Sequence, residues 1–389
     1  MGTRPELLVV IYKDVAPILI SRFGDREETV RLEVWATYGV ILNQTLLYGG
    51  SPQPKDSEVP VRGKRKRDDI VMDVEESPYV LLRGQVPSLL KTLLGQLKSP
   101  RTPPTTLQAG FGLLHSLLGV LPGCLSSQSG PILSIARSVL SQPPSTSTST
   151  LHLTCLAFLA RFFATHSTPT FSGSLSNLTP VLLNLLGERH PRIASETFRV
   201  FSSLLQASKP ISSADWVDRV YGQAVVRLGS HDTDAEVRTC AEESIADLWI
   251  CATDMLRSKN NKEWEYMCRS TGKTEGAVRV ITKVAKEVTI SDQWVNGCLE
   301  WLMGLLRRSG RTGKGEIFAA LDVLLRRWAP SAPKPLFISL TVVEVSPPAS
   351  RKAFQPPSFL KLKLSSPHLI SLFSPKRCLP SLFSWSSLP

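Results

Sequence analysis

The fold is decided by a pattern first met in the stretch DVAPILISRFGDREETVRLEVW (Asp14–Trp35). Apolar residues at helical spacing are followed by a short polar break, after which apolar residues at helical spacing resume. Glu27 lies in this break, and Arg31 follows four residues later at the start of the second apolar stretch. The stretch therefore predicts two amphipathic helices joined by a tight turn.

The same acid-to-arginine spacing opens two later apolar stretches, at Asp234/Arg238 and Glu275/Arg279. It places both charges on one side of a first helical turn, with the acid at the N-terminus, where the helix dipole favours it. An exposed pair of this kind contributes only about 0.3–0.5 kcal/mol. The recurrence of the motif, rather than its energy, marks the turn of a repeating helical hairpin.

The hairpins recur at steps of 39 to 44 residues. These steps separate the first inward-facing apolar residues of the second helices, which are Leu107, Leu151, Ile193, Val237, Val278 and Ile317. Apolar stripes that supply first helices lie upstream, in Leu178–Leu186, Trp216–Leu228 and Trp294–Leu306. Two helices in a period of about 40–47 residues are typical of HEAT and armadillo repeats, which bury their apolar faces only by stacking. The sequence thus predicts an all-α, HEAT/armadillo-type α-α superhelical solenoid over residues 10–328.

Two segments fall outside the periodicity. The step from Val30 to Leu107 is too long for one repeat, and the excess, residues 49–77, combines prolines with dense charge. We predict a disordered loop inserted between two repeats. Residues 329–389 hold 11 of the 29 prolines and no repeat pattern. They are predicted to form a disordered, Pro/Ser-rich basic tail.

Charge and hydropathy argue against a nucleic-acid or membrane partner. The net charge is +12, but the tail supplies half of it and the remainder forms no basic stripe. The longest uncharged apolar run, Leu107–Leu125, contains four glycines and a proline, so we predict a buried helix rather than a membrane span. The seven cysteines are scattered without zinc-finger spacing, as in a reduced protein of the cytoplasm or nucleus.

No complete catalytic or cofactor motif is present. STGKT (Ser270–Thr274) and GRTGKGE (Gly310–Glu316) resemble phosphate-binding loops, but Met267 replaces a required glycine in the first, and Gly315 replaces the magnesium-binding hydroxyl in the second. The six histidines lie far apart in the sequence. We therefore expect no catalytic residues, no cofactor and no metal, and a protein that is not an enzyme. An enzyme on a helical scaffold is the alternative, and it would require clustered acids or a nucleophile pair.

One short motif is typical of a targeting signal. GKRKRDD contains the basic cluster Lys64, Arg65, Lys66 and Arg67 within the predicted loop, as a nuclear import signal requires. The alternative is a solvated charge run, because five acids follow within ten residues. With this signal, the chain is expected in both the cytoplasm and the nucleus.

A known family shares several of these stretches. The chain resembles the cullin-associated and neddylation-dissociated proteins over residues 10–328. The resemblance is carried by APILISRFGDREETVRLEVWATYGVILNQT (Ala16–Thr45), QVPSLLKTLLGQL (Gln85–Leu97), LLGVLPGCL (Leu117–Leu125), LTPVLLNLLGERHPRIASETF (Leu178–Phe198) and HDTDAEVRTCAEESI (His231–Ile245). The first stretch is more specific than generic HEAT spacing.

The resemblance implies a non-catalytic HEAT scaffold that wraps the cullin–RING core of ubiquitin ligases. Such a scaffold binds cullins lacking the ubiquitin-like modifier and regulates assembly of SCF complexes by letting substrate receptors exchange. We expect this chain to match an interior segment only, without the repeats that grip the RING end or displace the adaptor. The resemblance assigns no contact residues. A nuclear transport receptor, or another HEAT scaffold such as a phosphatase subunit, is the alternative.

The ends of the predicted array lead to a further expectation. Solenoids require terminal repeats with a polar outer face. The first hairpin is expected to begin near Asp14 and the last to end at Trp328. We therefore predict uncovered apolar side chains at both ends, namely Val15, Ile18 and Leu19 at one end and Leu321, Leu324 and Trp328 at the other.

Overall fold

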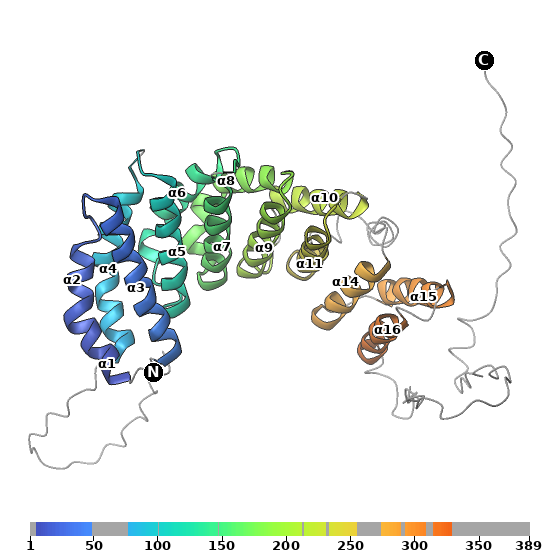
Figure 1. Ribbon diagram of the computed structural model, residues 1–389. Helices are drawn as coiled ribbons and strands as arrows, with labels where there is room; N and C mark the ends of the chain where they lie inside the picture. Colours follow the sequence, from blue (N-terminus) through green and yellow to red (C-terminus); the bar gives the residue numbers. More distant parts are fainter. Residues whose placement is uncertain are drawn as a thin grey trace, which may run out of the picture. The chain divides into compact units, whose positions relative to one another are not determined.

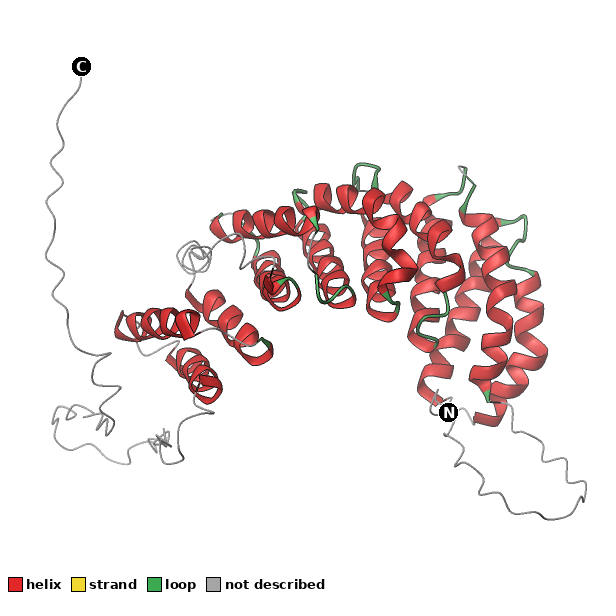
Figure 2. Ribbon diagram, turned by 180° about the vertical axis from the view of Figure 1, so that it is seen from behind, coloured by secondary structure: helices red, strands yellow, loops and turns green. Residues whose placement is uncertain are grey.

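The structure is a computed structural model that describes residues 5–48, 77–99, 101–146, 148–211, 214–230, 233–254, 274–288, 292–308 and 314–328. These residues form helices and turns and contain no strand (Figure 2), which confirms the predicted all-α class. The helices are α1 (Pro5–Val10), a π-helical turn (Ile11–Val15), α2 (Ala16–Ser21), α3 (Glu28–Tyr48), α4 (Pro78–Leu97), α5 (Pro104–Val120), a 3₁₀ turn (Ser126–Gln128), α6 (Ser129–Leu140), α7 (Ser149–Thr165), α8 (Thr168–Leu186), α9 (Pro191–Ala207), α10 (Asp215–Gly229), α11 (Ala235–Cys251), α14 (Thr274–Glu287), α15 (Asp292–Arg308) and α16 (Lys314–Trp328).

Several predictions concern residues outside the described ranges. Of the loop predicted for residues 49–77, only the last residue, Ser77, is described, and it directly precedes α4. The basic cluster Lys64–Arg67 lies in the same undescribed stretch, and the tail predicted for residues 329–389 is also undescribed. These predictions therefore stay predictions.

The helices form two layers (Figure 1). In one layer the second helices pack in series, in the order α3, α5, α7, α9, α11, α14 and α16. In the other, the first helices α2, α4, α6, α8 and α10 contact their neighbours in chain order, and they do so less extensively. Each predicted inward residue from Leu107 to Ile317 lies near the start of a second helix. The predicted solenoid is confirmed.

Prolines inside helices lie in the first-helix layer. Pro87 interrupts α4 and Pro180 interrupts α8. Pro17 lies in the first turn of α2, directly after the π-helical turn Ile11–Val15. Because proline has no N–H, Pro17 cannot donate to the carbonyl of Lys13, and a widened turn relieves the clash of its ring. The first helix of the first hairpin thus begins at Pro5, well before the expected Asp14.

One continuous apolar core runs through the array. Its largest aromatic cluster joins α5, α7 and α8, where Phe111 contacts Phe158 at a ring-centroid distance of 5.4 Å and Phe163 contacts Phe171 at 4.9 Å. Such aromatic pairs add about 0.5–1.5 kcal/mol each to the burial of their area. These side chains fix the stacking of the middle repeats.

The two end hairpins expose apolar side chains, but not always those predicted. Ile18 is 65% exposed and Val15 is 42% exposed, as predicted for the first hairpin. At the other end the prediction was wrong for Leu321 and Leu324, which are buried, whereas the side chain of Trp328 lies outside the described residues. The α16 helix packs against α14 and α15, and Phe318 (41%) and Leu325 (36%) are exposed beside its buried stripe.

Candidate functional site

The arginines of the recurring motif hold the hairpin turns together. Arg31 donates from Nη1 to the main-chain oxygen of Asp25, at 2.7 Å. Arg238 donates from Nη1 to the carbonyl of Leu228 at 2.9 Å and from Nη2 to that of Ser230 at 3.0 Å. Carbonyls at a helix end lack partners within the helix, so each guanidinium satisfies an acceptor that would otherwise need water.

The predicted pairing of these arginines with the acid four residues earlier is therefore wrong at the first two motifs, within the described part of the chain. The acid has a separate role in the second motif. The side chain of Asp234 caps α11 by accepting a hydrogen bond from the Glu236 main-chain N–H at 2.8 Å. N-caps of this kind contribute about 1 kcal/mol. The side chain of Glu275, from the third motif, lies outside the described residues.

Arg279, from the third motif, reaches the preceding repeat. Its Nε and Nη2 atoms donate to Oε2 of Glu242 on α11, at 3.2 and 2.7 Å. Nη1 also lies 4.0 Å from Oε1 of Glu316 on α16. Gly276 makes this approach feasible, because a Cβ atom there would collide with Oε1 of Glu242. A nearly buried carboxylate is thus held between two second helices.

Two further contacts join the same layer. Asp247 of α11 accepts hydrogen bonds at Oδ1 from Lys283 of α14, at 2.8 Å, and from Gln206 of α9, at 3.0 Å. Arg199 of α9 pairs with Glu196 on its own helix and reaches Glu236 of α11 at 3.1 Å. We call these three sets of contacts, centred on Glu242, Asp247 and Arg199, the polar ladder.

Two of the three sets in the polar ladder bury the acid and leave the base facing solvent, whereas Arg199 and Glu236 in the third are about equally exposed. The side chains of Glu242 and Asp247 are about 5% exposed, whereas those of Arg279 and Lys283 are 49% and 40% exposed. Arg192 and Lys286 are exposed on the same helical stripes as Arg199 and Lys283. This face of α9, α11 and α14 is therefore suited to a polar partner that carries acids.

The second helices α5 and α7 present a different surface. They contain no Asp, Glu or Lys, and Arg161 is their only arginine. Its Nη1 atom donates to the main-chain oxygen of His115 at 3.2 Å, across Gly119. Burial, and then the charge of Arg161, lower the pKa of His115, which favours the neutral ring. This section of the layer is almost uncharged.

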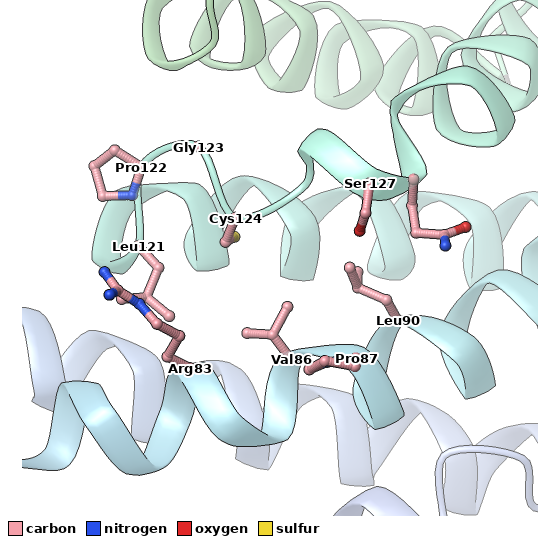
Figure 3. Close-up of a pocket in the computed structure, with 10 residues that line it drawn as sticks. Arg83, Val86, Pro87, Leu90, Leu121, Pro122, Gly123, Cys124 and Ser127 are labelled. Atoms are coloured by element: carbon pink, nitrogen blue, oxygen red, sulfur yellow. The ribbon is translucent and has the colours of Figure 1, made fainter. Parts of the chain in front are cut away.

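A hollow of about 300 Å³ lies between α4 and the turn that follows α5 (Figure 3). Arg83 and Leu121 lie at one end, Ser127 lies at the other, and Val86 and Cys124 lie between them. Burial raises the pKa of the Cys124 thiol to about 12, so it stays protonated at neutral pH and is a poor nucleophile. The hollow has room for an apolar side chain but offers no catalytic pair.

The remaining sequence predictions concern metal binding, membrane spans and the apolar run 107–125. Within those ranges, His, Cys, Asp and Glu side chains do not gather in threes as a metal site requires. None of the helices described is long and apolar enough to cross a membrane. The 107–125 run folds as α5 and a turn, between α3 and α7.

Comparison with known proteins supports the family resemblance predicted from the sequence. Residues 120–245 match the family model "CAND1-like, TPR repeats". The chain is 29% identical over 263 residues to the cullin-associated NEDD8-dissociated protein 1 of Arabidopsis thaliana, covering 66% of this chain and 20% of that protein. The Dictyostelium discoideum protein of the same name is 28% identical over 254 residues, or 64% and 18%. The resemblance predicted from the sequence is confirmed.

The chain spans about a fifth of the length of these relatives. The matched repeats include α9 and most of α11, which carry much of the polar ladder. Among solved structures, a designed armadillo repeat protein is 10% identical with a TM-score of 0.45, over 79% of this chain and 99% of that one. Kap121p is 12% identical with a TM-score of 0.39, over 82% and 38%.

Proposed function

We propose that the chain is a non-catalytic scaffold that binds a cullin–RING core and regulates the assembly of SCF-type ubiquitin ligases. The observation that carries this proposal is the match of residues 120–245 to the CAND1-like family model, with relatives named for cullin association. The two-layered helical array supports a scaffold, because stacked repeats offer long surfaces to one partner.

The polar ladder face is the part of the array that we assign to the partner. Its exposed cations would meet acidic side chains, and the uncharged section on α5 and α7 would accept apolar or main-chain contacts. Arg192 and Lys286 are exposed there. Reversing their charge should weaken binding without breaking the contacts that join the repeats.

The test is a binding titration of the purified full chain with an unmodified cullin–RING complex and with its NEDD8-linked form. We expect binding of the unmodified complex and weakened binding by the double variant Arg192→Glu/Lys286→Glu. Arg219→Glu is the matched control, because Arg219 is exposed on α10 in the first-helix layer. Failure to bind any cullin would refute the proposal. Binding of a transport GTPase or of a phosphatase catalytic subunit in the same titration would favour the alternative scaffolds instead.

Localisation to both cytoplasm and nucleus is part of the proposal. It rests on the basic cluster Lys64–Arg67 in the sequence. A fluorescent fusion of the chain should enter the nucleus, and replacing these four residues with alanine should reduce its nuclear fraction. An unchanged distribution would show that the cluster is only a solvated charge run.

A further inference from the structure

A long section of the chain carries positive charge without any acid. Residues 77–187 contain six lysines and arginines but no Asp or Glu, although the whole chain has 33 acids. This section covers the helices from α4 to α8, whereas the polar ladder lies on α9, α11 and α14. An acidic partner would meet no repulsion from the side chains of this section.

The hollow between α4 and the turn after α5 lies within this section, and its floor is apolar. Val86 and Leu90 of α4 and Leu121 of the turn are buried. Exposed residues surround this floor, so the hollow is open to solvent; they are Arg83, Pro87, Pro122 and Ser127. Its volume of about 300 Å³ is at the lower end of the range of ligand pockets. The hollow therefore suits one large apolar side chain of a partner.

A cation stands at one end of the hollow (Figure 3). Arg83 is exposed, and it takes part in none of the ion pairs found among the described residues. Burial raises the pKa of the Cys124 thiol and the charge of Arg83 lowers it in part, so the guanidinium acts on the lining of the hollow. The main-chain oxygen of Arg83 lacks its helical donor, because Pro87 has no N–H. A carboxylate and a peptide N–H would both find partners here.

A second cation follows the opposite end of the hollow. Leu90 lies at the end away from Arg83 (Figure 3), and Lys91 comes directly after it and is exposed. At about 1.5 Å per residue, the two cations are separated by about 12 Å along α4. Two acids four positions apart in an extended peptide are separated by about 13 Å. The residue midway between these acids points to the same face of the peptide and would enter the hollow.

We propose that the hollow is a docking site for an extended acidic segment of a partner protein, in which one apolar residue is flanked two positions away on each side by an acid. The apolar side chain would occupy the hollow, and the two carboxylates would contact Arg83 and Lys91. The site is separate from the polar ladder face and does not depend on the function proposed for that face. One partner could therefore occupy each surface.

A nucleic acid fits this surface less well than an acidic peptide. Proteins that bind single strands combine a groove lined by cations with exposed aromatic side chains on which the bases stack. The described residues between 77 and 187 expose no Phe, Tyr or Trp side chain, and α4 presents only two cations. The surface thus offers paired charges around an apolar hollow rather than a continuous basic groove.

Fluorescence anisotropy with the full chain tests this proposal. The probe is a labelled peptide in which one leucine is flanked two positions away on each side by glutamate, with glycine and serine elsewhere. We expect saturable binding. Replacing the leucine of the probe with alanine should weaken binding about tenfold, because less apolar surface would enter the hollow. Replacing both glutamates with glutamine should also weaken binding and should remove its dependence on salt.

Variants of the chain locate the site. Arg83→Glu should weaken binding of the probe about tenfold, because repulsion replaces the attraction of one carboxylate. Ser127→Trp should weaken it as well, since a large side chain at the rim would fill the hollow. Arg137→Glu is the matched control, because Arg137 is exposed in the last turn of α6, about 12 Å along that helix from the hollow. This distance exceeds the screening length of about 8 Å at physiological salt, so the affinity should change less than about twofold.

Each possible outcome decides for or against the site. All the substituted positions are exposed, circular dichroism verifies that each variant is folded, and the altered probes test the same contacts on the native chain. Absence of saturable binding would overturn the proposal. Equal weakening by Arg83→Glu and Arg137→Glu would overturn it too, because the attraction would then be non-specific. A polyuridine RNA that bound more tightly than the peptide, with an affinity unchanged by Ser127→Trp, would identify a nucleic-acid surface instead.

Discussion

The contact between Glu242 and Arg279 predicts the largest effect of a single substitution in the polar ladder. The Glu242 side chain is 5% exposed, and its Oε2 atom accepts two hydrogen bonds from the guanidinium. Arg279→Met keeps most of the side-chain length but removes the positive charge. The carboxylate would then stay buried without its cation, close to Gly276 at the start of α14.

The expected loss is about 1.5–3 kcal/mol, the contribution of hydrogen bonds to a charged group, because the Glu242 carboxylate is buried but the Arg279 side chain is 49% exposed. The second contact of Arg279, to Glu316, adds little, because both side chains are 49% exposed and lie 4.0 Å apart. The double variant Glu242→Leu/Arg279→Met should recover most of the loss. An apolar pair of similar volume often replaces a buried ion pair without cost.

Hydrogen exchange measured by mass spectrometry locates the effect. Stability in a stacked array is close to a sum of terms within repeats and between neighbours. Arg279→Met should therefore speed exchange in α14, α15 and α16 and leave α5 and α7 nearly unchanged. In urea, the C-terminal helices of the variant should unfold at a lower concentration than the rest of the array. A change below about 0.5 kcal/mol, the scale of ordinary surface substitutions, would refute this account, as would a double variant no more stable than the single one.

Three other outcomes follow from the contacts described. Gly276→Ala should lower the melting temperature, because its Cβ would collide with Oε1 of Glu242; an unchanged melting temperature would mean that the carboxylate can move away. Burial lowers the pKa of His166 in the folded chain from its ordinary value of 6.5. As the pH falls, His166 is therefore protonated in the unfolded chain before it is protonated in the folded chain, and the free energy of unfolding should decrease below a pH of about 6.5. His166→Gln should flatten this dependence in urea titrations at a series of pH values, and an identical slope would contradict the assignment. Alkylation of the native chain should leave Cys155 unmodified, because burial raises its thiol pKa and blocks access, whereas rapid labelling would show that α7 opens.

The sequence predicted the second helices well because their spacing is set by burial. Residues such as Ile193 and Val237 recur one period apart since each must cover the helix before it. Local main-chain geometry was less predictable. The apolar run predicted as one buried helix ends at Val120, because Leu121 leaves helical geometry and Gly123 takes a positive φ of 77°. The Pro122-Gly123 dipeptide is a signal for that turn, which the prediction of a single helix passed over.

The polar ladder was missed, although a signal for it exists. Its inter-repeat charged contacts join residues 36 or 37 positions apart, which is close to one repeat period. Opposite charges four residues apart mark the hairpin turns, but this spacing does not include the contacts between repeats. The stronger signal is an acid at a position where the preceding second helices have apolar residues, as with Glu242, where α7 has Leu156 and α9 has Phe198. Such an acid requires a cation from the next repeat.

The array thus joins its repeats in two ways, and the difference bears on how a partner would bind. Phenylalanines join α5, α7 and α8, whereas buried carboxylates and half-exposed cations join α9, α11 and α14. An acidic partner that competed for Arg279 would leave Glu242 buried without its cation, at a cost comparable with that of removing the arginine. Productive contacts should therefore use the exposed cations beside the ladder and leave the ladder intact. Affinity for an acidic partner is then set by residues such as Arg192 and Lys286, while the ladder fixes the spacing between them.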